Sequence, residues 1–201
     1  MKQFLLNPGR AGGWGGIGFV ILLFVSAAMV VLPTAEEPGE RIIAFYKQHP
    51  QEIAIQQLTG AIALLPFLVF AASLGPNRWL MPAAFLLAAC ELLTNVIPLA
   101  IVIAPGLSTT SAHSLTLLED LADAALFMSI ALFLIAATLK DPLWIRVLAV
   151  LVALACAIRA FASPVGFTVL DAPAPLAFVA FVLLLSVRRI LTPAQSGLAR
   201  K

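Results

Sequence analysis

Long apolar runs recur six times along the 201-residue chain, and short polar segments separate them. A helix needs about 20 mostly apolar residues to cross the hydrocarbon core of a bilayer. Each run has about this length, so the pattern predicts six transmembrane helices, expected at residues 15–32, 53–74, 80–104, 115–139, 143–162 and 173–191. The sequence therefore predicts an all-α fold with one transmembrane domain over residues 1–192 and a cytoplasmic tail over residues 193–201.

The composition agrees with this pattern. Apolar residues make up 62% of the chain and charged residues only 11%, whereas a soluble domain has about 25% charged residues. The mean hydropathy is +1.05. These values exclude a disordered chain, a nucleic-acid-binding protein and an ordinary soluble enzyme. The lipid bilayer is therefore the first expected partner, and no nucleic acid is expected to bind.

Charged residues are sorted between the two sides of the membrane. If the N-terminus is cytoplasmic, the inner segments carry a net charge of +8, the outer segments −3 and the spans −3. The inner basic residues are Lys2, Arg10, Arg78, Lys140, Arg146, Arg188, Arg189, Arg200 and Lys201, against Asp141 alone. Because arginine and lysine in short loops mark the cytoplasmic side, both termini are predicted to be cytoplasmic. The expected location is the cell's inner (cytoplasmic) membrane.

The segment between the first two spans is the longest connection. Pro38 suits a helix start, and Ile42 and Tyr46 are among the apolar residues that gather on one side of the following turns. This pattern predicts a short interfacial helix on the outer surface, or an ordered loop that caps the bundle. The start of the chain could also imitate a signal peptide, but Pro33 is a poor residue for a cleavage site, so a retained first helix is predicted.

Five ionisable residues fall inside the predicted spans, where charge is costly and commonly functional. They are Glu91, Glu119, Asp120, Asp123 and Arg159. At 1.5 Å per residue, Glu91 is expected about 16 Å from the inner edge, Asp123 about 12 Å from the outer edge and Asp120 about 7–8 Å from it. Asn95 lies one turn beyond Glu91, and Gln56 and Gln57 lie near the outer end of the second span. These positions predict a polar pocket that opens outward.

Charge balance sharpens the pocket hypothesis. Four carboxylates face one arginine, so protonation, a bound cation or amine, or water must compensate the excess negative charge. Arg159 is expected to pair with Asp120 or Asp123, and Glu91 is expected to be the more buried acid. A purely structural interpretation is also open, because carboxylates near a helix start are favoured by the helix dipole and Arg159 with one aspartate could simply join two helices.

Other motifs are weaker evidence for a function. Gly13–Gly18 matches the G-x-G-x-x-G pattern, but no strand precedes it, so the glycines are expected to permit close helix packing instead of binding a nucleotide. His49 and His113 are weak candidates for a metal site, and neither is placed for a buried haem. Cys90 and Cys156 are expected to be buried packing residues. Nothing in the sequence specifies a cofactor.

The outer segment Glu40–His49, followed at once by an apolar run, resembles a broad class of uncharacterised bacterial multi-pass membrane proteins of the actinobacterial type. In that class an I-x-x-F/Y-Y-x-x-H segment joins the first two helices. The turns around Arg78-Trp79 and Pro142-Leu143-Trp144 are also similar. The resemblance implies a bacterial inner-membrane protein and implies no activity and no residue roles.

Four functions remain open from the sequence. The first is a membrane protein that binds a cation, amine or small amphiphile in an acidic pocket. The second is a proton- or ion-coupled transporter, and the third is an accessory or assembly subunit of a membrane complex, or a homo-oligomer. A membrane enzyme acting on a lipophilic substrate is weaker, because no nucleophile–base pair or metal motif accompanies the carboxylates.

Overall fold

The computed structural model describes residues 8–104 and 106–191, and these residues are all-helical apart from their connections. The helices are α2 (Pro8–Ala27), α3 (Gly39–Gln48), α4 (Pro50–Ser73), α5 (Leu80–Ile103), α6 (Thr109–Thr138), α7 (Leu143–Ala162) and α8 (Pro173–Leu191), with a 3-10 turn at Ser163–Val165. Six of them are long and apolar enough to cross a membrane. The predicted six-helix bundle is confirmed, and the predicted tail over residues 193–201 lies outside the described residues.

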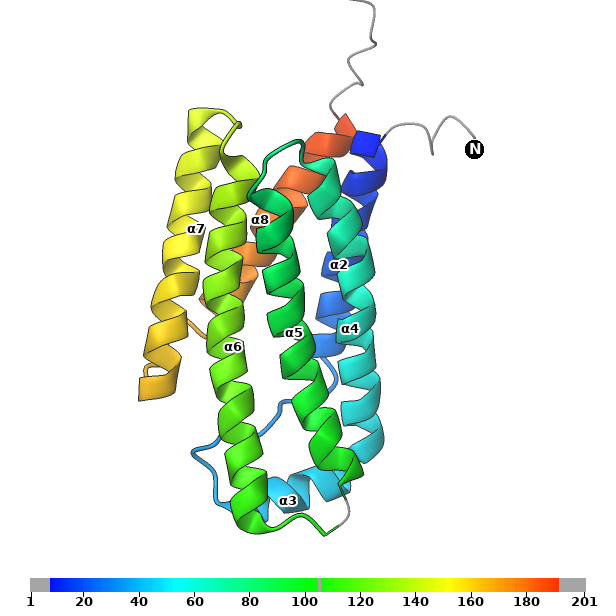
Figure 1. The fold of residues 1–201 in the computed structure, drawn as a ribbon, viewed down its shortest axis with the longest axis vertical. Coiled ribbons are helices and arrows are strands. Elements are labelled where there is room, and N and C mark those ends of the chain that lie inside the picture. Colours follow the sequence, from blue (N-terminus) through cyan, green and yellow to red (C-terminus); the bar gives the residue numbers. More distant parts are fainter. Residues whose placement is uncertain (1–7, 105, 192–201) are drawn as a thin grey trace, which may run out of the picture.

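The six long helices form a ring in which each packs against its neighbours in sequence, and α2 closes the ring by packing against α8. Short turns make successive helices antiparallel, so Pro8 and Leu191 lie at the same end of the bundle (Figure 1). Helix α3 lies across the opposite end, beneath α4, α5 and α6, which extend farther than α7. We call the former the basic end and the latter the α3 end.

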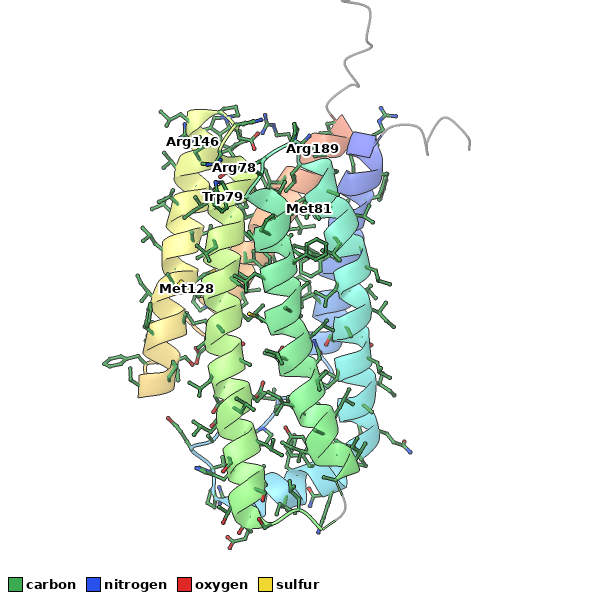
Figure 2. All side chains as sticks on the ribbon, in the orientation of Figure 1. Arg78, Trp79, Met81, Met128, Arg146 and Arg189 are labelled. Atoms are coloured by element: carbon green, nitrogen blue, oxygen red, sulfur yellow. The ribbon has the colours of Figure 1, made fainter. Side chains whose placement is uncertain are left out.

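The basic end is named for its described charged side chains. They are Arg10, Arg78, Lys140, Arg146, Arg188 and Arg189, with Asp141 as the acidic residue, which forms an ion pair with Arg188. Figure 2 shows Arg78, Arg146 and Arg189 together at this end. The structure thus gathers the loop charges used by the positive-inside rule at one end, and the cytoplasmic position of the basic end stays a prediction of that rule.

Three helix ends differ from the predicted bounds by more than three residues, and the first is the start of α2, at Pro8 instead of residue 15. Helix α2 stops at Ala27, although apolar residues continue to Leu32, because Val30 and Leu32 leave the helix and pack against the small apolar cluster under α3. Helix α6 begins at Thr109 instead of residue 115, because Ser108 caps it and its hydroxyl accepts a hydrogen bond from the Ser111 amide at 3.1 Å. Hydropathy alone locates apolar length, whereas caps and tertiary packing locate helix ends.

Helix α3 agrees with two predicted features of the outer segment, a short helix and a cap over the bundle. It begins directly after Pro38, and it buries Ile42 and Tyr46 against Ile53 of α4 and Ile97 of α5. It is therefore a helix, as predicted, and it caps the α3 end of the bundle. Its polar side carries Arg41 and Lys47, which are exposed.

Tight packing joins the helices between the two ends. Phe67 of α4 stacks with Phe19 of α2 and Phe133 of α6, with 5.1 Å between ring centroids in both pairs. Glycines bring α2 close to its neighbours, since a side chain at Gly16 would collide with Ser186 and Phe70. The expected role of this glycine segment in close helix packing is confirmed. Cys90 and Cys156 are buried and not bonded to each other, as predicted.

The outer surface of the ring is apolar. Large aliphatic and aromatic side chains are exposed on all six long helices, for example Ile21 on α2, Leu65 on α4 and Leu151 on α7. Water would disfavour so much contiguous apolar surface, whereas lipid chains would cover it. The fold and its surface define the chain as a multi-pass membrane protein.

Candidate functional site

A cavity of about 300 Å³ lies towards the α3 end, where α6 meets two connections. One connection precedes α3 and contributes Glu36, and the other joins α7 to α8 and contributes Asp171. Helix α6 contributes His113, Asp120 and Asp123. Counting from Thr138 at the basic end, Asp123 lies about 22 Å along α6, which places the cavity in the outer part of a core about 30 Å thick.

Arg159 of α7 links two of these carboxylates. Its Nη1 atom lies 2.6 Å from Asp123 Oδ2, and its Nε atom lies 3.3 Å from Asp171 Oδ1. The second contact is an ion pair without hydrogen-bond geometry. The predicted pairing of Arg159 with Asp120 or Asp123 is thus resolved in favour of Asp123, and Asp171 joins it from a loop.

The guanidinium of Arg159 is also stacked on an aromatic ring. Its central carbon lies 3.7 Å from the ring centroid of Phe127, one turn beyond Asp123 on α6. A cation over an aromatic face is stabilised by the ring quadrupole, more strongly where water is excluded. The ring and two carboxylates together hold the guanidinium in one position.

Asp120 and Glu36 form the part of the cavity wall that is not joined to Arg159. Asp120 Oδ2 accepts a hydrogen bond of 2.9 Å from the Ala35 amide, which fixes the connection before α3 against α6. Within the described residues, neither carboxylate forms an ion pair with a lysine or arginine. The cavity therefore carries more negative charge than Arg159 can compensate.

Glu119 directly precedes Asp120 on α6 but does not line this cavity. Its charge acts instead on Tyr46 of α3, which is buried beside α6. Burial, and then the negative charges of Glu119 and Asp120, raises the pKa of the Tyr46 phenol above its usual value of about 10. Tyr46 thus lies in the negative field of the site, although its residue type gave no sign of this in the sequence.

Glu91 lines a second cavity. This cavity has a volume of about 390 Å³ and lies among α2, α5, α6 and the start of α8. Its walls are otherwise apolar, and they include Phe19, Phe127 and Phe178. Asn95 donates to the Glu91 carbonyl oxygen at 2.6 Å and to its Oε1 atom at 3.3 Å, so the two residues, which the sequence places one turn apart, are in contact.

The two cavities are neighbours. Phe127 lines the apolar cavity with its ring and carries Arg159 on its face, and Asp171 and Ala172, adjacent in sequence, line the acidic and the apolar cavity respectively. Glu91 and Asp123 therefore line separate cavities, whereas the sequence predicted a single pocket, and the Phe127–Arg159 contact connects the two.

The remaining candidates are placed elsewhere. Gln56 Nε2 donates to the Val30 carbonyl at 3.0 Å, so it ties α4 to the end of α2, and Gln57 is buried on α4. His49 ends α3 and packs against the Phe45 ring, far in the chain from His113 in the acidic cavity. Among the residues that the structure describes, no group of three or more histidine, cysteine or acidic side chains could hold a metal ion.

Comparisons with known proteins found no protein similar to this chain. No family model, no curated protein and no solved structure matches the chain. The two cavities are therefore the features of the molecule that point to a function. Their chemistry suits recognition of positive charge, because carboxylates in a partly desolvated site attract a cation more strongly than carboxylates in water.

Proposed function

We propose that the protein binds a small organic cation, an amine or a cationic amphiphile, in the acidic cavity on the outer side of a bacterial inner membrane. The observation that carries this proposal is the convergence of Glu36, Asp120, Asp123 and Asp171 on one cavity beside a single arginine. Asp123 and Asp171 are committed to Arg159, so Asp120 and Glu36 are the groups available to a ligand.

The apolar part of the acidic cavity's own wall supports an amphiphile in particular. A ligand with a positively charged head and a short apolar tail could place the head by Asp120 and rest the tail against Leu117, Leu121 and Pro164, which line the same cavity. Burial of apolar ligand surface would then add to the electrostatic attraction. The proposal therefore predicts tighter binding for an alkylamine than for a compact cation of equal charge.

Thermal unfolding of the purified protein in lipid nanodiscs tests the proposal. The probes are tetramethylammonium, hexylammonium and spermidine chlorides, each compared with sodium chloride at equal ionic strength. A bound cation should raise the unfolding temperature in a saturable way, because binding to the folded state alone stabilises it. We expect hexylammonium to saturate at the lowest concentration of the three.

Asp120→Asn is the decisive variant. The amide oxygen of asparagine can still accept the bond from the Ala35 amide, so the local backbone stays in place while the charge is lost. Loss of one charged contact should weaken binding about tenfold. Glu52→Gln is the matched control, because Glu52 is exposed on the first turn of α4 and outside the cavity. Equal weakening by both variants, or no saturable effect of any probe, would contradict the proposal.

One observation favours a second candidate, an ion-coupled transporter. Glu91 lies about 16 Å along α5 from the basic end, close to mid-membrane, and Phe127 of its cavity contacts Arg159, the partner of Asp123 in the acidic cavity. Movement of the Phe127–Arg159 pair would connect the two acidic regions. Uptake of labelled hexylamine into proteoliposomes under an imposed pH gradient distinguishes the candidates: a transporter exceeds empty liposomes and loses uptake with Glu91→Gln, whereas a binding protein shows no excess.

A further inference from the structure

A second surface of the molecule, far from the acidic cavity, has the features of a ligand site. A groove of about 330 Å³ runs between α5 and α6 towards the basic end. Pro82 and Leu86 form one wall, Leu132, Ile135 and Leu139 form the other, and Trp79 lies at its end. Leu86 and Leu132 are each nearly half exposed, so the groove opens on the surface that faces lipid.

The turn between α4 and α5 is tied down over this groove. Asn77 donates its side-chain amide to the Ala136 carbonyl of α6 at 2.6 Å, and its side-chain oxygen accepts from the Trp79 amide at 3.1 Å. These bonds hold Arg78 and Trp79 at the head of the groove, and Figure 2 shows both at the basic end. The Arg78 guanidinium carbon lies 5.0 Å from the Trp79 ring centroid.

A second cationic side chain, that of Lys140, follows the α6 wall of the groove in the chain. Lys140 directly follows Leu139, and its Nζ atom donates to the Pro76 carbonyl at 2.7 Å, close in the chain to Arg78. Within the described part of the chain, neither Arg78 nor Lys140 forms an ion pair. Asp141, the nearby acid, is paired with Arg188. The head of the groove is therefore positive, while its length is apolar.

We propose that this groove binds an anionic phospholipid, with the phosphate between Arg78 and Lys140 and one acyl chain along Leu86 and Ile135. Tryptophan and basic residues at a membrane boundary suit the headgroup region, and a basic site between helices on the cytoplasmic side suits an acidic headgroup. A zwitterionic lipid has an added ammonium group for which the site offers no carboxylate. The groove thus selects by headgroup charge and holds the lipid by its chain.

Quenching of Trp79 by brominated lipid chains tests the proposal locally. The chain has three tryptophans, so Trp14→Phe combined with Trp144→Phe leaves Trp79 as the reporter. Nanodiscs of ordinary phosphatidylcholine receive increasing fractions of brominated phosphatidylglycerol or brominated phosphatidylcholine. At about fivefold in affinity per cation, the two cations should give phosphatidylglycerol about a 25-fold preference.

Variants at the two ends of the bundle make the test specific. Arg78→Gln or Lys140→Gln should each reduce the preference about fivefold, and the pair should remove most of it. Arg41→Gln is the matched control, because it removes an exposed arginine from α3 at the opposite end. Lys140 is exposed, so its variant is informative even where Arg78→Gln impairs folding.

Three results would overturn the proposal. Equal quenching by the two brominated lipids in the reporter protein would exclude headgroup selection. Retention of the preference in Arg78→Gln/Lys140→Gln, or its loss in Arg41→Gln, would assign it to net charge instead of the groove. Relief of phosphatidylglycerol quenching by millimolar inorganic phosphate would identify the ligand as a phosphate ion, not a lipid.

Discussion

The acidic and apolar cavities differ in chemistry, although one contact connects them: Arg159, which pairs with Asp123 of the acidic cavity, stacks on Phe127 of the apolar one. The acidic cavity takes its charged groups from α6 and two loops, and the arginine beside it is fixed by Asp123 and Asp171. The apolar cavity takes its walls mostly from helices and contains one acid, Glu91, bonded to its own helix neighbour Asn95. We infer from the contact between Phe127 and Arg159 that this pair lies at the boundary between the two cavities, so changes there should have the largest effects.

Phe127→Ala should have the largest effect. It removes a buried ring, which costs about 3 kcal/mol of stability, and it should open the apolar cavity to the acidic one. Access is measured as the modification rate of Leu87→Cys by a charged, membrane-impermeant thiol reagent, in a Cys90→Ala/Cys156→Ala background. We expect the rate to rise in Phe127→Ala.

Phe178→Ala is the control for that experiment. Phe178 is buried and lines the same apolar cavity, but it does not contact Arg159. It should lose comparable stability without a faster reaction at Leu87→Cys. If both variants raise the rate equally, the boundary role of Phe127 is wrong.

Arg159→Met should have the next largest effect. The substitution leaves Asp123 and Asp171 facing each other without a cation, and because both are about a third exposed, the expected loss is about 2 kcal/mol. Equilibrium unfolding in mixed micelles measures it. Adding Asp123→Asn should recover part of the loss, whereas Arg146→Met, at an exposed position, should leave stability nearly unchanged. Absence of any recovery would argue against the ion-pair explanation.

Tyr46 reports the charge of the acidic side. The chain has a single tyrosine, so phenolate absorbance follows Tyr46 alone. Because its pKa is raised in the folded protein, the unfolded state should lose its proton first as the pH rises. The contribution of the Tyr46 phenol to the free energy of unfolding is constant below about pH 10 and is lost as the pH rises above it. Native protein at pH 11 should therefore show much less phenolate than protein unfolded in detergent and denaturant.

Removing a neighbouring charge should shift that titration. Glu119→Gln should lower the apparent pKa of Tyr46, because it removes a negative charge that opposes the phenolate. Glu52→Gln, remote from the pair, should not. An unchanged titration in Glu119→Gln would show that the charge of Glu119 does not act on Tyr46.

Glu91→Gln should have the smallest effect on cation binding. Glutamine keeps the oxygen that accepts from Asn95, and Glu91 lies on the apolar side of Phe127. We expect the affinity for hexylammonium to change less than about twofold, against the about tenfold loss in Asp120→Asn. A loss in Glu91→Gln equal to that in Asp120→Asn would mean that the two cavities act as one.

The sequence predicted the bundle better than the site, for a physical reason. Apolar length is a local property, so the six spans could be read directly, whereas their sidedness stays a prediction from loop charge. The pairing of Glu91 with Asn95 was likewise predictable, because it lies within one helix. The bond from Ala35 to Asp120, by contrast, joins positions in different elements.

Loops account for most of what could not be predicted. Asp171 lies in the connection between α7 and α8, and its reach to Arg159 depends on how that connection turns after Gly166, which has a positive φ of 84°. Gln56 and Glu119 have the polarity expected of site residues, yet neither lines the acidic cavity. Gln56 bonds to the segment after α2, and the charge of Glu119 acts on Tyr46 of α3. Polarity inside a membrane span marks a constraint, but it does not tell which neighbour imposes it.

Closure of the helical ring has a consequence for biogenesis. Gly13 and Gly16 of α2 pack against α8, where a side chain at Gly13 would come within 2.7 Å of the Ser186 carbonyl. The ribosome delivers α2 first and α8 last, so this seam is the last to form. Until then, the glycine face of α2 remains open to lipid or to insertion factors. Insertion of α8 is thus the step that closes the ring formed by the described helices.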